Sequence, residues 1–385
     1  MNDYILWVGN VFKDEVVERH RGLAASANYW RRGLLSGLKA AGADLKVLGH
    51  RNEQVWPKGK LFPNEEDSMD EGFQSTLVKW VNFPGIRYYL LGKSHIWACR
   101  KMVAQFGPPS VALTYNPTPW HLPLAIYLQE VHHVPWVSVT LDYDHVEDGW
   151  DEYVRDAGSA DGHVFLSHWA YENCPCEVPK LHLDGGFTEW FGDDLLEPES
   201  KATKVCLYSG KYTDYGGYDL LLGTAKRFRG QGVEFWFTGK IPDNKRNELE
   251  AVGKHVKVMG FVNDAKLHEL NLRADLFLNP RPSDFIVNKV AFPSKLVRYL
   301  AYGKPVVSTW TPGISPEYRE YLFVPPREDS DSFAMTIQGV LRLASEEKED
   351  LKQRIHGFLR SEKSWNIQGQ RLKEWIVNQI LISKQ

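Results

Sequence analysis

Lys295 and Ser294 open a predicted helix, and they are well suited to hold an anion. The run Phe-Pro-Ser-Lys-Leu at 292–296 follows a predicted turn, and the run Ala-Tyr-Gly-Lys-Pro-Val-Val-Ser at 301–308 supplies a glycine stop and a second strand. A lysine beside the first turn of a helix, together with a hydroxyl group and exposed backbone amides, stabilises negative charge. We expect that anion to be a phosphate group.

Two more basic residues follow buried strands of the same half. Lys211 comes after Gly210 at the end of a predicted strand at 205–209. Ligands of open α/β sheets bind beyond the carboxyl ends of strands, so a phosphate contact competes here with an ordinary surface lysine. Arg281 lies between two prolines past the strand at 275–279. It either faces a base or phosphate or only shapes the turn.

In the first half, acids and a histidine follow a predicted strand at 137–141, namely Asp142, Asp144 and His145. Such groups can activate an acceptor hydroxyl or stabilise developing positive charge in a transition state. The Asp-x-Asp pattern also occurs at divalent-metal sites, and a solvated acidic loop is the third interpretation. Since a lone Asp-x-Asp is common by chance, we expect no metal here.

Strands and helices alternate along most of the chain. A helix is predicted at 28–41, where apolar residues recur at helical spacing up to Gly42. Strands of the first half are predicted at 4–9, 45–48, 111–115, 134–141 and 163–167, with a polar loop from about 50 to 75. Repeated strand–helix alternation predicts a parallel, doubly wound sheet.

The same pattern starts again after a polar stretch at 193–204. We therefore predict an α/β fold with two Rossmann-like domains facing across a cleft. The expected boundaries are 1–190 for the first domain and 204–330 for the second. The helices predicted at 331–385 are expected to pack back across the domain junction.

Composition excludes several classes of protein. The 385 residues carry 46 basic and 49 acidic side chains, a net charge of −3, so we expect no nucleic-acid partner. Cys174 and Cys176 are too close in sequence to pair easily and have no second pair for a zinc site, which favours reduced cytosolic thiols. With no signal peptide and no bilayer-length apolar stretch expected, the predicted location is cytoplasmic.

From Val205 to about Tyr321 the chain resembles the C-terminal domain of the large group 1 family of retaining GT-B glycosyltransferases, which includes many bacterial capsule, O-antigen and polysaccharide enzymes. Four pieces occur in the family's order, and together they are specific: Ser-Gly-Lys at 209–211 with Gly-Tyr-Asp-Leu-Leu at 217–221, Phe-Thr-Gly at 237–239, Met-Gly-Phe-Val at 259–262, and the run from Pro-Arg-Pro at 280–282 to Gly-Lys-Pro-Val-Val at 303–307.

The resemblance implies transfer of a sugar from a nucleotide-sugar donor to a carbohydrate or lipid-linked acceptor, with retention and without a metal or other cofactor, in cell-surface polysaccharide or glycoconjugate biosynthesis. It assigns donor binding to the second domain and acceptor binding to the first. Lys211, next to Gly210, and Lys295, next to Ser294, would contact the donor diphosphate. Asp142, with Asp144 and His145, would face the reacting carbon.

Two positions depart from the family's pattern. Arg298 stands where the family usually has a glutamate that accepts hydrogen bonds from ribose, and an arginine only donates. Asp284 or Glu317 takes over the ribose, or Arg298 binds an extra anionic group of the donor, or nucleotide-sugar binding has been lost. Gly216 replaces a second lysine.

Two other functions stay open on the sequence. One is a nucleotide-sugar epimerase or hydrolase of the same architecture. The other is a non-catalytic nucleotide-sugar or glycan-binding subunit, which the two departures favour. The segment 87–103 mixes aromatic and basic residues, so it predicts either a helix in contact with an anionic membrane, at the inner face of the cell membrane, or an ordinary surface helix.

Overall fold

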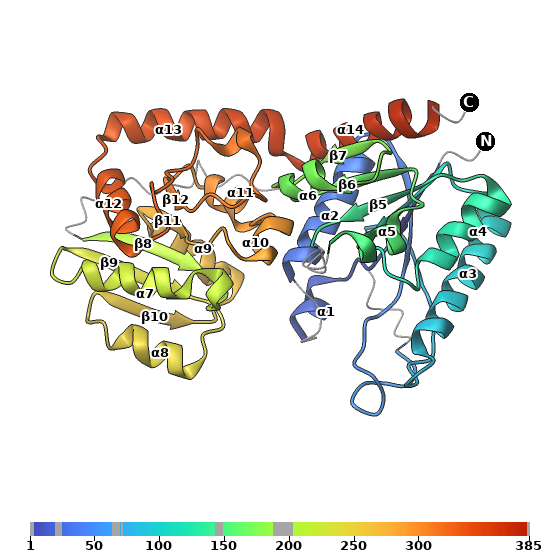
Figure 1. Cartoon of the computed structure of the whole chain (residues 1–385), viewed down its shortest axis with the longest axis horizontal. Coiled ribbons are helices and arrows are strands. Elements are labelled where there is room, and N and C mark those ends of the chain that lie inside the picture. Colours follow the sequence, from blue (N-terminus) through green and yellow to red (C-terminus); the bar gives the residue numbers. More distant parts are fainter. Residues whose placement is uncertain are drawn as a thin grey trace. The chain divides into compact units, whose positions relative to one another are not determined.

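The computed structural model describes residues 4–19, 25–63, 70, 72–142, 149–187 and 203–382 (Figure 1). The chain divides into two compact units, which we call the first domain (1–186 with 365–385) and the second domain (187–364). Within the described residues, no helix combines the length and the apolar character that a membrane span requires. Both domains contain a parallel sheet flanked by helices, so the predicted α/β fold with two Rossmann-like domains is confirmed.

The sheet of the first domain has seven strands in the order β3-β2-β1-β4-β5-β6-β7, all paired in parallel. Its strands are β1 (Tyr4–Val8), β2 (Asp44–Gly49), β3 (Gln74–Leu77), β4 (Val111–Tyr115), β5 (Trp136–Thr140), β6 (Gly162–Phe165) and β7 (Lys180–His182). The order reverses between β1 and β4, which is where open sheets of this kind bind ligands.

Helices cover this sheet because its strands are apolar on both faces. They are α1 (Asp14–Arg19), α2 (Ala25–Ala40), α3 (Arg87–Phe106), α4 (Leu122–His132), α5 (Asp151–Ala157), α6 (His168–Asn173) and α14 (Trp365–Trp375), which continues as a π-helix at Ile376–Leu381. α3 and α4 pack side by side (Figure 1). Leu6 of β1, Cys99 of α3 and Leu128 of α4 are fully buried in one apolar cluster.

The segment after residue 330 is shared between the domains, because residues 331–364 belong to the second domain and α14 packs on α2 of the first. Glycines let these two helices approach closely. A Cβ atom on Gly37 would lie 1.9 Å from the carbonyl oxygen of Trp365, and one on Gly369 would lie 2.1 Å from the backbone of Gly37. The Trp365 ring packs edge-on against Trp30 at 6.0 Å between centroids.

The second domain has a five-stranded parallel sheet in the order β10-β9-β8-β11-β12. Its strands are β8 (Lys204–Ser209), β9 (Val233–Thr238), β10 (Val256–Gly260), β11 (Leu276–Asn279) and β12 (Val306–Ser308). Its helices are α7 (Tyr218–Arg227), α8 (Asp243–Glu250), α9 (Asp264–Arg273), α10 (Ile286–Val290), α11 (Lys295–Leu300), α12 (Ser330–Leu341) and α13 (Ser345–Phe358), with short turns η3 (Asp214–Gly216), η4 (Pro316–Tyr318) and η5 (Leu359–Lys363). Here the strand order reverses between β8 and β11.

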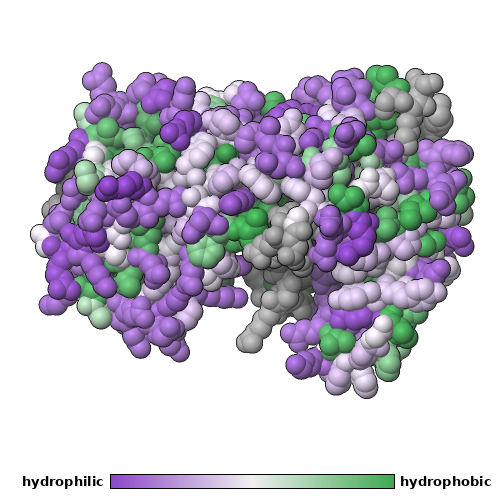
Figure 2. Space-filling model, in the orientation of Figure 1, coloured by the Kyte–Doolittle hydropathy of each residue, from purple (hydrophilic) through white to green (hydrophobic). Residues whose placement is uncertain are grey.

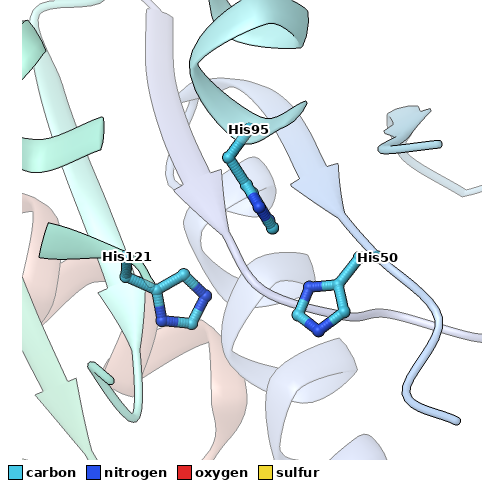
Figure 3. Close-up of side chains that lie close together, drawn as sticks. All are labelled: His50, His95 and His121. Atoms are coloured by element: carbon cyan, nitrogen blue, oxygen red, sulfur yellow. The ribbon is translucent and has the colours of Figure 1, made fainter. Parts of the chain in front are cut away.

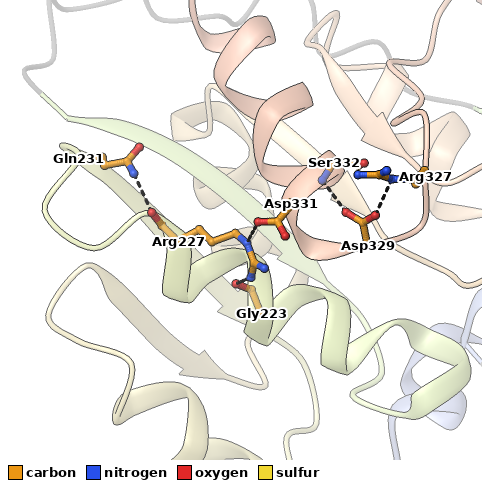
Figure 4. A network of polar contacts seen from close by, with 7 residues as sticks. All are labelled: Gly223, Arg227, Gln231, Arg327, Asp329, Asp331 and Ser332. Atoms are coloured by element: carbon orange, nitrogen blue, oxygen red, sulfur yellow. Dashed lines mark hydrogen bonds and ion pairs between the residues drawn. The ribbon is translucent and has the colours of Figure 1, made fainter.

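A polar network lies where α12 begins beside α7 (Figure 4). Arg227 of α7 pairs with Asp331, and Asp329 caps α12 by accepting a 2.7 Å hydrogen bond from the Ser332 amide. Exposed ion pairs contribute little stability, whereas a helix cap contributes about 1 kcal/mol. Burial of Phe333 in the apolar core of the second domain therefore does more to hold α12 in place than the charges do.

Candidate functional site

Lys295 lies where β8 and β11 end, at the reversal point of the second sheet. Its Nζ atom donates a 2.9 Å hydrogen bond to the carbonyl oxygen of Ser209, the last residue of β8, and lies 4.3 Å from the centre of the Tyr208 ring. The hydroxyl of Tyr299 accepts a 3.0 Å hydrogen bond from the Ser209 amide. One turn of α11 is thus tied to the end of β8, and a Cβ atom on Gly210 would lie 2.5 Å from Nζ.

The electrostatics of this place favour an anion. Burial lowers the pKa of Lys295 well below its ordinary value, and the positive charge of Arg281 lowers this pKa further. A negative ligand beside two basic groups offsets their mutual repulsion and favours the charged form of the lysine. We call Lys295 and Arg281 the cationic pair, because an anion bound at this ligand-binding edge of the sheet would favour the charged form of Lys295 beside the guanidinium of Arg281.

Two turns are held together around this pair. The Asn288 side chain is buried and donates 2.8 Å hydrogen bonds to the carbonyl oxygens of Tyr215 and Pro282. Gly217 has a φ of +81°, and a Cβ atom there would lie 1.9 Å from the Pro280 carbonyl oxygen. The turn after β11, which carries Arg281, is therefore fixed against the loop after β8.

The loop after β8 places Lys211 on the surface and explains Gly216. Lys211 is exposed, and its carbonyl oxygen accepts a 2.7 Å hydrogen bond from the Tyr208 hydroxyl. A Cβ atom on Gly216 would lie 2.6 Å from that same carbonyl oxygen. Because any side chain at 216 would collide with the backbone, this loop conformation leaves no room for the family's second lysine.

Ser294, Arg298 and Asp284 are exposed around the pair. Ser294 already has helical backbone angles and its side chain does not cap α11, which has six residues. Arg298 lies one turn beyond Lys295 on the same helix, and Asp284 lies in the turn before α10. Their part in donor binding therefore stays a prediction.

Glu317 already has a partner. Its carboxylate lies 2.6 Å from Nζ of Lys363, whose side chain is 1% exposed. That ammonium also lies 4.8 Å from the centre of the Tyr318 ring. Breaking an ion pair with a buried lysine is costly, so Glu317 is poorly suited to take over the ribose, and Asp284 is the better placed of the two acids.

In the first domain, Asp142 lies just after β5 and is exposed, while Asp144 and His145 fall outside the described residues. The neighbouring strand end carries groups that the sequence analysis did not name. Arg31 of α2 is buried with its guanidinium 4.6 Å from the centre of the Tyr115 ring, and burial lowers the pKa of Arg31. Arg31 could have been noticed in the sequence, because it is an arginine on the otherwise apolar face of the helix predicted at 28–41.

Tyr208, Tyr299 and Asn288 were also missed in the second domain. Tyr299 follows Lys295 by four residues, which is the spacing of one helical face, so that residue could have been named. Asn288 gave no local signal, since its role depends on two turns that are distant in sequence.

Part of the chain matches a known protein family. Residues 203–342 match the family model for glycosyl transferases group 1, so the second domain matches a group 1 glycosyltransferase domain. No curated protein sequence matches the chain.

The fold is that of solved GT-B glycosyltransferases. Sucrose-phosphate synthase from Thermosynechococcus elongatus is 14% identical, with 99% of this chain and 100% of that chain covered and a TM-score of 0.67. Anabaena HepE, solved in complex with UDP and glucose, is 13% identical over 98% and 100% of the two chains, with a TM-score of 0.63. The lipopolysaccharide outer core galactosyltransferase WaaB is 12% identical over 98% and 100%, with a TM-score of 0.65.

Proposed function

We propose that the protein is a glycosyltransferase that moves a sugar from a nucleotide-sugar donor to a carbohydrate or lipid-linked acceptor. The observation that carries this proposal is the cationic pair of Lys295 and Arg281 at the reversal point of a group 1 glycosyltransferase domain. HepE, which shares the fold, binds UDP at 13% identity to this chain. A nucleoside diphosphate is both the anion that such a pair would hold and the leaving group of the proposed reaction.

Lys295 would act mainly in the transition state. Negative charge grows on the diphosphate as the bond to the sugar breaks, and an ammonium group held in a partly buried place stabilises this charge strongly. Arg281 and the exposed Lys211 would share the remaining charge, with Gly210 and Ser294 beside the diphosphate. We infer that this cationic set fills the role that a metal ion has in other transferases, so the reaction needs none.

Asp142 is the described candidate for orienting the acceptor in the first domain, with Asp144 and His145 as its neighbours in sequence. We propose that the sugar is transferred with retention of its anomeric configuration, in cell-surface polysaccharide or glycoconjugate synthesis. Arg298 would bind the donor, either through an extra anionic group or beside a ribose held by Asp284.

The proposed role of Asp142 can be tested by kinetics. If Asp142 orients the acceptor, Asp142→Asn should lower kcat more than it changes the KM of the donor.

The donor can be found by thermal shift. UDP, GDP, CMP, dTDP and their sugars would each be added to the full chain, and a ligand that binds the folded state at 100 times its Kd adds about 2.7 kcal/mol of stability. The true nucleotide should raise Tm fully in wild type and in Lys257→Met, a surface control, and clearly less in Lys295→Met. No shift with any nucleotide would contradict the proposal.

Turnover separates the other functions. Release of free sugar or of an epimer without acceptor would favour the hydrolase or epimerase, and tight binding without turnover across the donor panel would favour a binding subunit. Activity should survive EDTA. Activity that is lost in EDTA and restored by Mg²⁺ or Mn²⁺, the oxygen-binding ions that accompany diphosphates, would contradict the metal-free mechanism.

A lipid-linked acceptor would bring the protein to the inner face of the cell membrane. On α3, the rings of Tyr89 and Trp97 are 67% and 58% exposed, and Nζ of Lys101 lies 3.6 Å from the centre of the Trp97 ring. Figure 2 shows hydrophobic residues scattered among hydrophilic ones on the face drawn, as is ordinary for a protein surface, so the proposal depends on the aromatic and basic residues of α3. Co-sedimentation with anionic vesicles should fall in Trp97→Ser, and no binding by wild type would rule out this contact.

A further inference from the structure

Three buried histidines lie together in the first domain, whereas the proposed donor site belongs to the second (Figure 3). His50 follows β2, His95 lies on α3, and His121 precedes α4. Their side chains are 6%, 0% and 6% exposed. One ring nitrogen of each lies within 4.8 Å of the corresponding nitrogens of the other two, and Figure 3 shows the rings turned toward a common space.

Each ring is fixed by a hydrogen bond on its other side. Nδ1 of His95 lies 2.9 Å from the carbonyl oxygen of Leu91, which can only accept, so this nitrogen carries the proton. Nδ1 of His121 lies 2.8 Å from the Thr118 hydroxyl, and the Asn52 side chain hydrogen-bonds His50. Histidines that bind metals are oriented in this way by a partner on the opposite nitrogen.

The inward nitrogens lack partners of their own. Nδ1 of His50 and Nε2 of His95 are buried and have no hydrogen-bond partner among the residues that the structure describes. Because Nδ1 of His95 carries the proton, Nε2 presents an unshared electron pair toward the common space. A buried polar atom left without a partner is costly, and an atom that accepts electron pairs from several rings at once would remove that cost.

Burial shifts the pKa of all three rings in the same direction. Burial lowers the pKa of His95 to about 4 and, with the charge of His95, that of His121 to about 3. Burial also lowers the pKa of His50 well below its usual range, helped by the other two rings and by Arg87. Burial thus favours the neutral form of each ring, which is the form that binds metal ions.

The spacing suits a small ion. Zinc–nitrogen bonds of about 2.0–2.1 Å put neighbouring nitrogens of a tetrahedral site roughly 3.3 Å apart. Nitrogens that already lie within 4.8 Å of one another reach that spacing by small ring movements. Trp80 packs edge-on against His50 at 6.0 Å between centroids and is 3% exposed, so an aromatic ring covers this side of the cluster.

We propose that His50, His95 and His121 bind one divalent transition-metal ion of the zinc type in the core of the first domain. Imidazole nitrogens suit such ions and not Mg²⁺, and three protein ligands leave a fourth position for water or hydroxide. The ion joins the end of β2, α3 and the start of α4. Its role is separate from the proposed sugar transfer, which uses the second domain's cationic pair.

The charge of Arg87 provides a test that distinguishes a bound metal ion from a bound anion. Its charge acts on His50, so it repels a cation and attracts an anion. Arg87→Gln should therefore tighten binding of Zn²⁺, whereas it would weaken binding of an anionic ligand. A single buried water molecule, which can donate hydrogen bonds to two of the nitrogens, is the simplest alternative occupant.

The test uses the untagged full chain, stripped with a chelator and titrated with Zn²⁺ against a chromophoric competitor. We expect one equivalent bound and a visible absorption band of tetrahedral Co²⁺ when cobalt replaces zinc. His95→Gln should weaken binding by about 100-fold or more, and Thr118→Val, which removes only an orienting partner, by about 10–100-fold. His163→Gln, a control that changes a buried histidine outside the cluster, should still bind one equivalent.

Several results would overturn the proposal. These are the lack of a stoichiometric Zn²⁺ or Co²⁺ complex, an octahedral cobalt spectrum, binding that His95→Gln leaves unchanged, and weaker binding in Arg87→Gln. If His95→Gln does not fold, Thr118→Val decides, because it keeps all three rings: unchanged affinity in that folded variant would refute the assignment.

Discussion

Removing the charge of Lys295 should separate ligand binding from stability. In Lys295→Met the ammonium is lost, and with it the 2.9 Å hydrogen bond to the Ser209 carbonyl oxygen. A charge-assisted hydrogen bond to a phosphate contributes about 1.5–3 kcal/mol, so the nucleoside diphosphate should bind about 10–150-fold more weakly. If Lys295 also stabilises the departing diphosphate, kcat should fall by about 100–1,000-fold.

Stability without ligand should change much less. Each unit by which folding lowers the pKa of Lys295 costs about 1.4 kcal/mol while the group stays charged, and loss of a hydrogen bond costs about 1 kcal/mol. The two effects oppose each other. We therefore expect the ligand-free variant to lose no more than about 1 kcal/mol of stability, the contribution of one hydrogen bond.

The direction in which folding shifts the pKa of Lys295 determines how the stability of the protein depends on pH. Because the folded pKa of Lys295 lies below the unfolded one, the unfolded chain binds more protons between the two values. Wild-type stability should thus gain a contribution as pH rises through that window toward the ordinary lysine pKa, and Lys295→Met should lack it. Bound nucleotide should remove the difference, since a phosphate restores the charged form.

Calorimetry with the donor nucleotide, urea unfolding at several pH values and donor kinetics provide the measurements. Lys257→Met, which changes an exposed lysine on β10, is the matched control. Wild-type nucleotide affinity in Lys295→Met would refute the reasoning, because the cationic pair would then have no part in binding. A large loss of ligand-free stability would show instead that Lys295 is chiefly a structural residue.

Three further substitutions, one of them with a matched control, test the departures from the family pattern and the packing of α14 on α2. Arg298→Ala should raise the donor KM by about tenfold, as expected for one exposed charge-assisted contact, and unchanged kinetics would remove Arg298 from the site. Gly216→Lys should not improve donor binding but should destabilise the protein by about 1–3 kcal/mol in urea unfolding, because its Cβ meets a backbone carbonyl; a stable, tighter-binding variant would contradict the loop geometry. Gly37→Ala should destabilise by a similar amount as α14 is pushed away at Trp365, whereas Gly339→Ala, which has open space, should be neutral or stabilising by up to about 1 kcal/mol.

The alternation of strands and helices could be predicted because parallel strands buried on both faces are short apolar runs. β3 was missed, since it lies at the edge of its sheet and its sequence, Gln-Ser-Thr-Leu, is mostly polar and partly exposed. The return of α14 to the first domain was not predictable in detail, because it depends on Gly37 and Gly369, which are more than 300 residues apart in sequence.

The candidate site was predictable where its residues are neighbours in sequence. Ser294 and Lys295 could be recognised together, but their pairing with Arg281 and the tie to Ser209 needed the folded sheet. The histidine cluster had no signal at all. Zinc sites are recognised by ligands a few residues apart, whereas these three come from a strand end, a helix and a loop that meet only in the fold.

The two departures from the family pattern, Gly216 and Arg298, are of different kinds. This difference bears on whether nucleotide-sugar binding has been lost or only altered. Gly216 is a conformational departure: the loop passes so close to the Lys211 carbonyl that a side chain is excluded, and Lys295 with Arg281 still supplies positive charge. Arg298 is a chemical departure, because it is exposed and nothing in the fold forces its identity. A domain without an anionic ligand would gain nothing from holding Lys295 beside Arg281, yet the two basic side chains lie together at an electrostatic cost. That cost is understandable if the second domain still binds a diphosphate and Arg298 adapts it to a different donor.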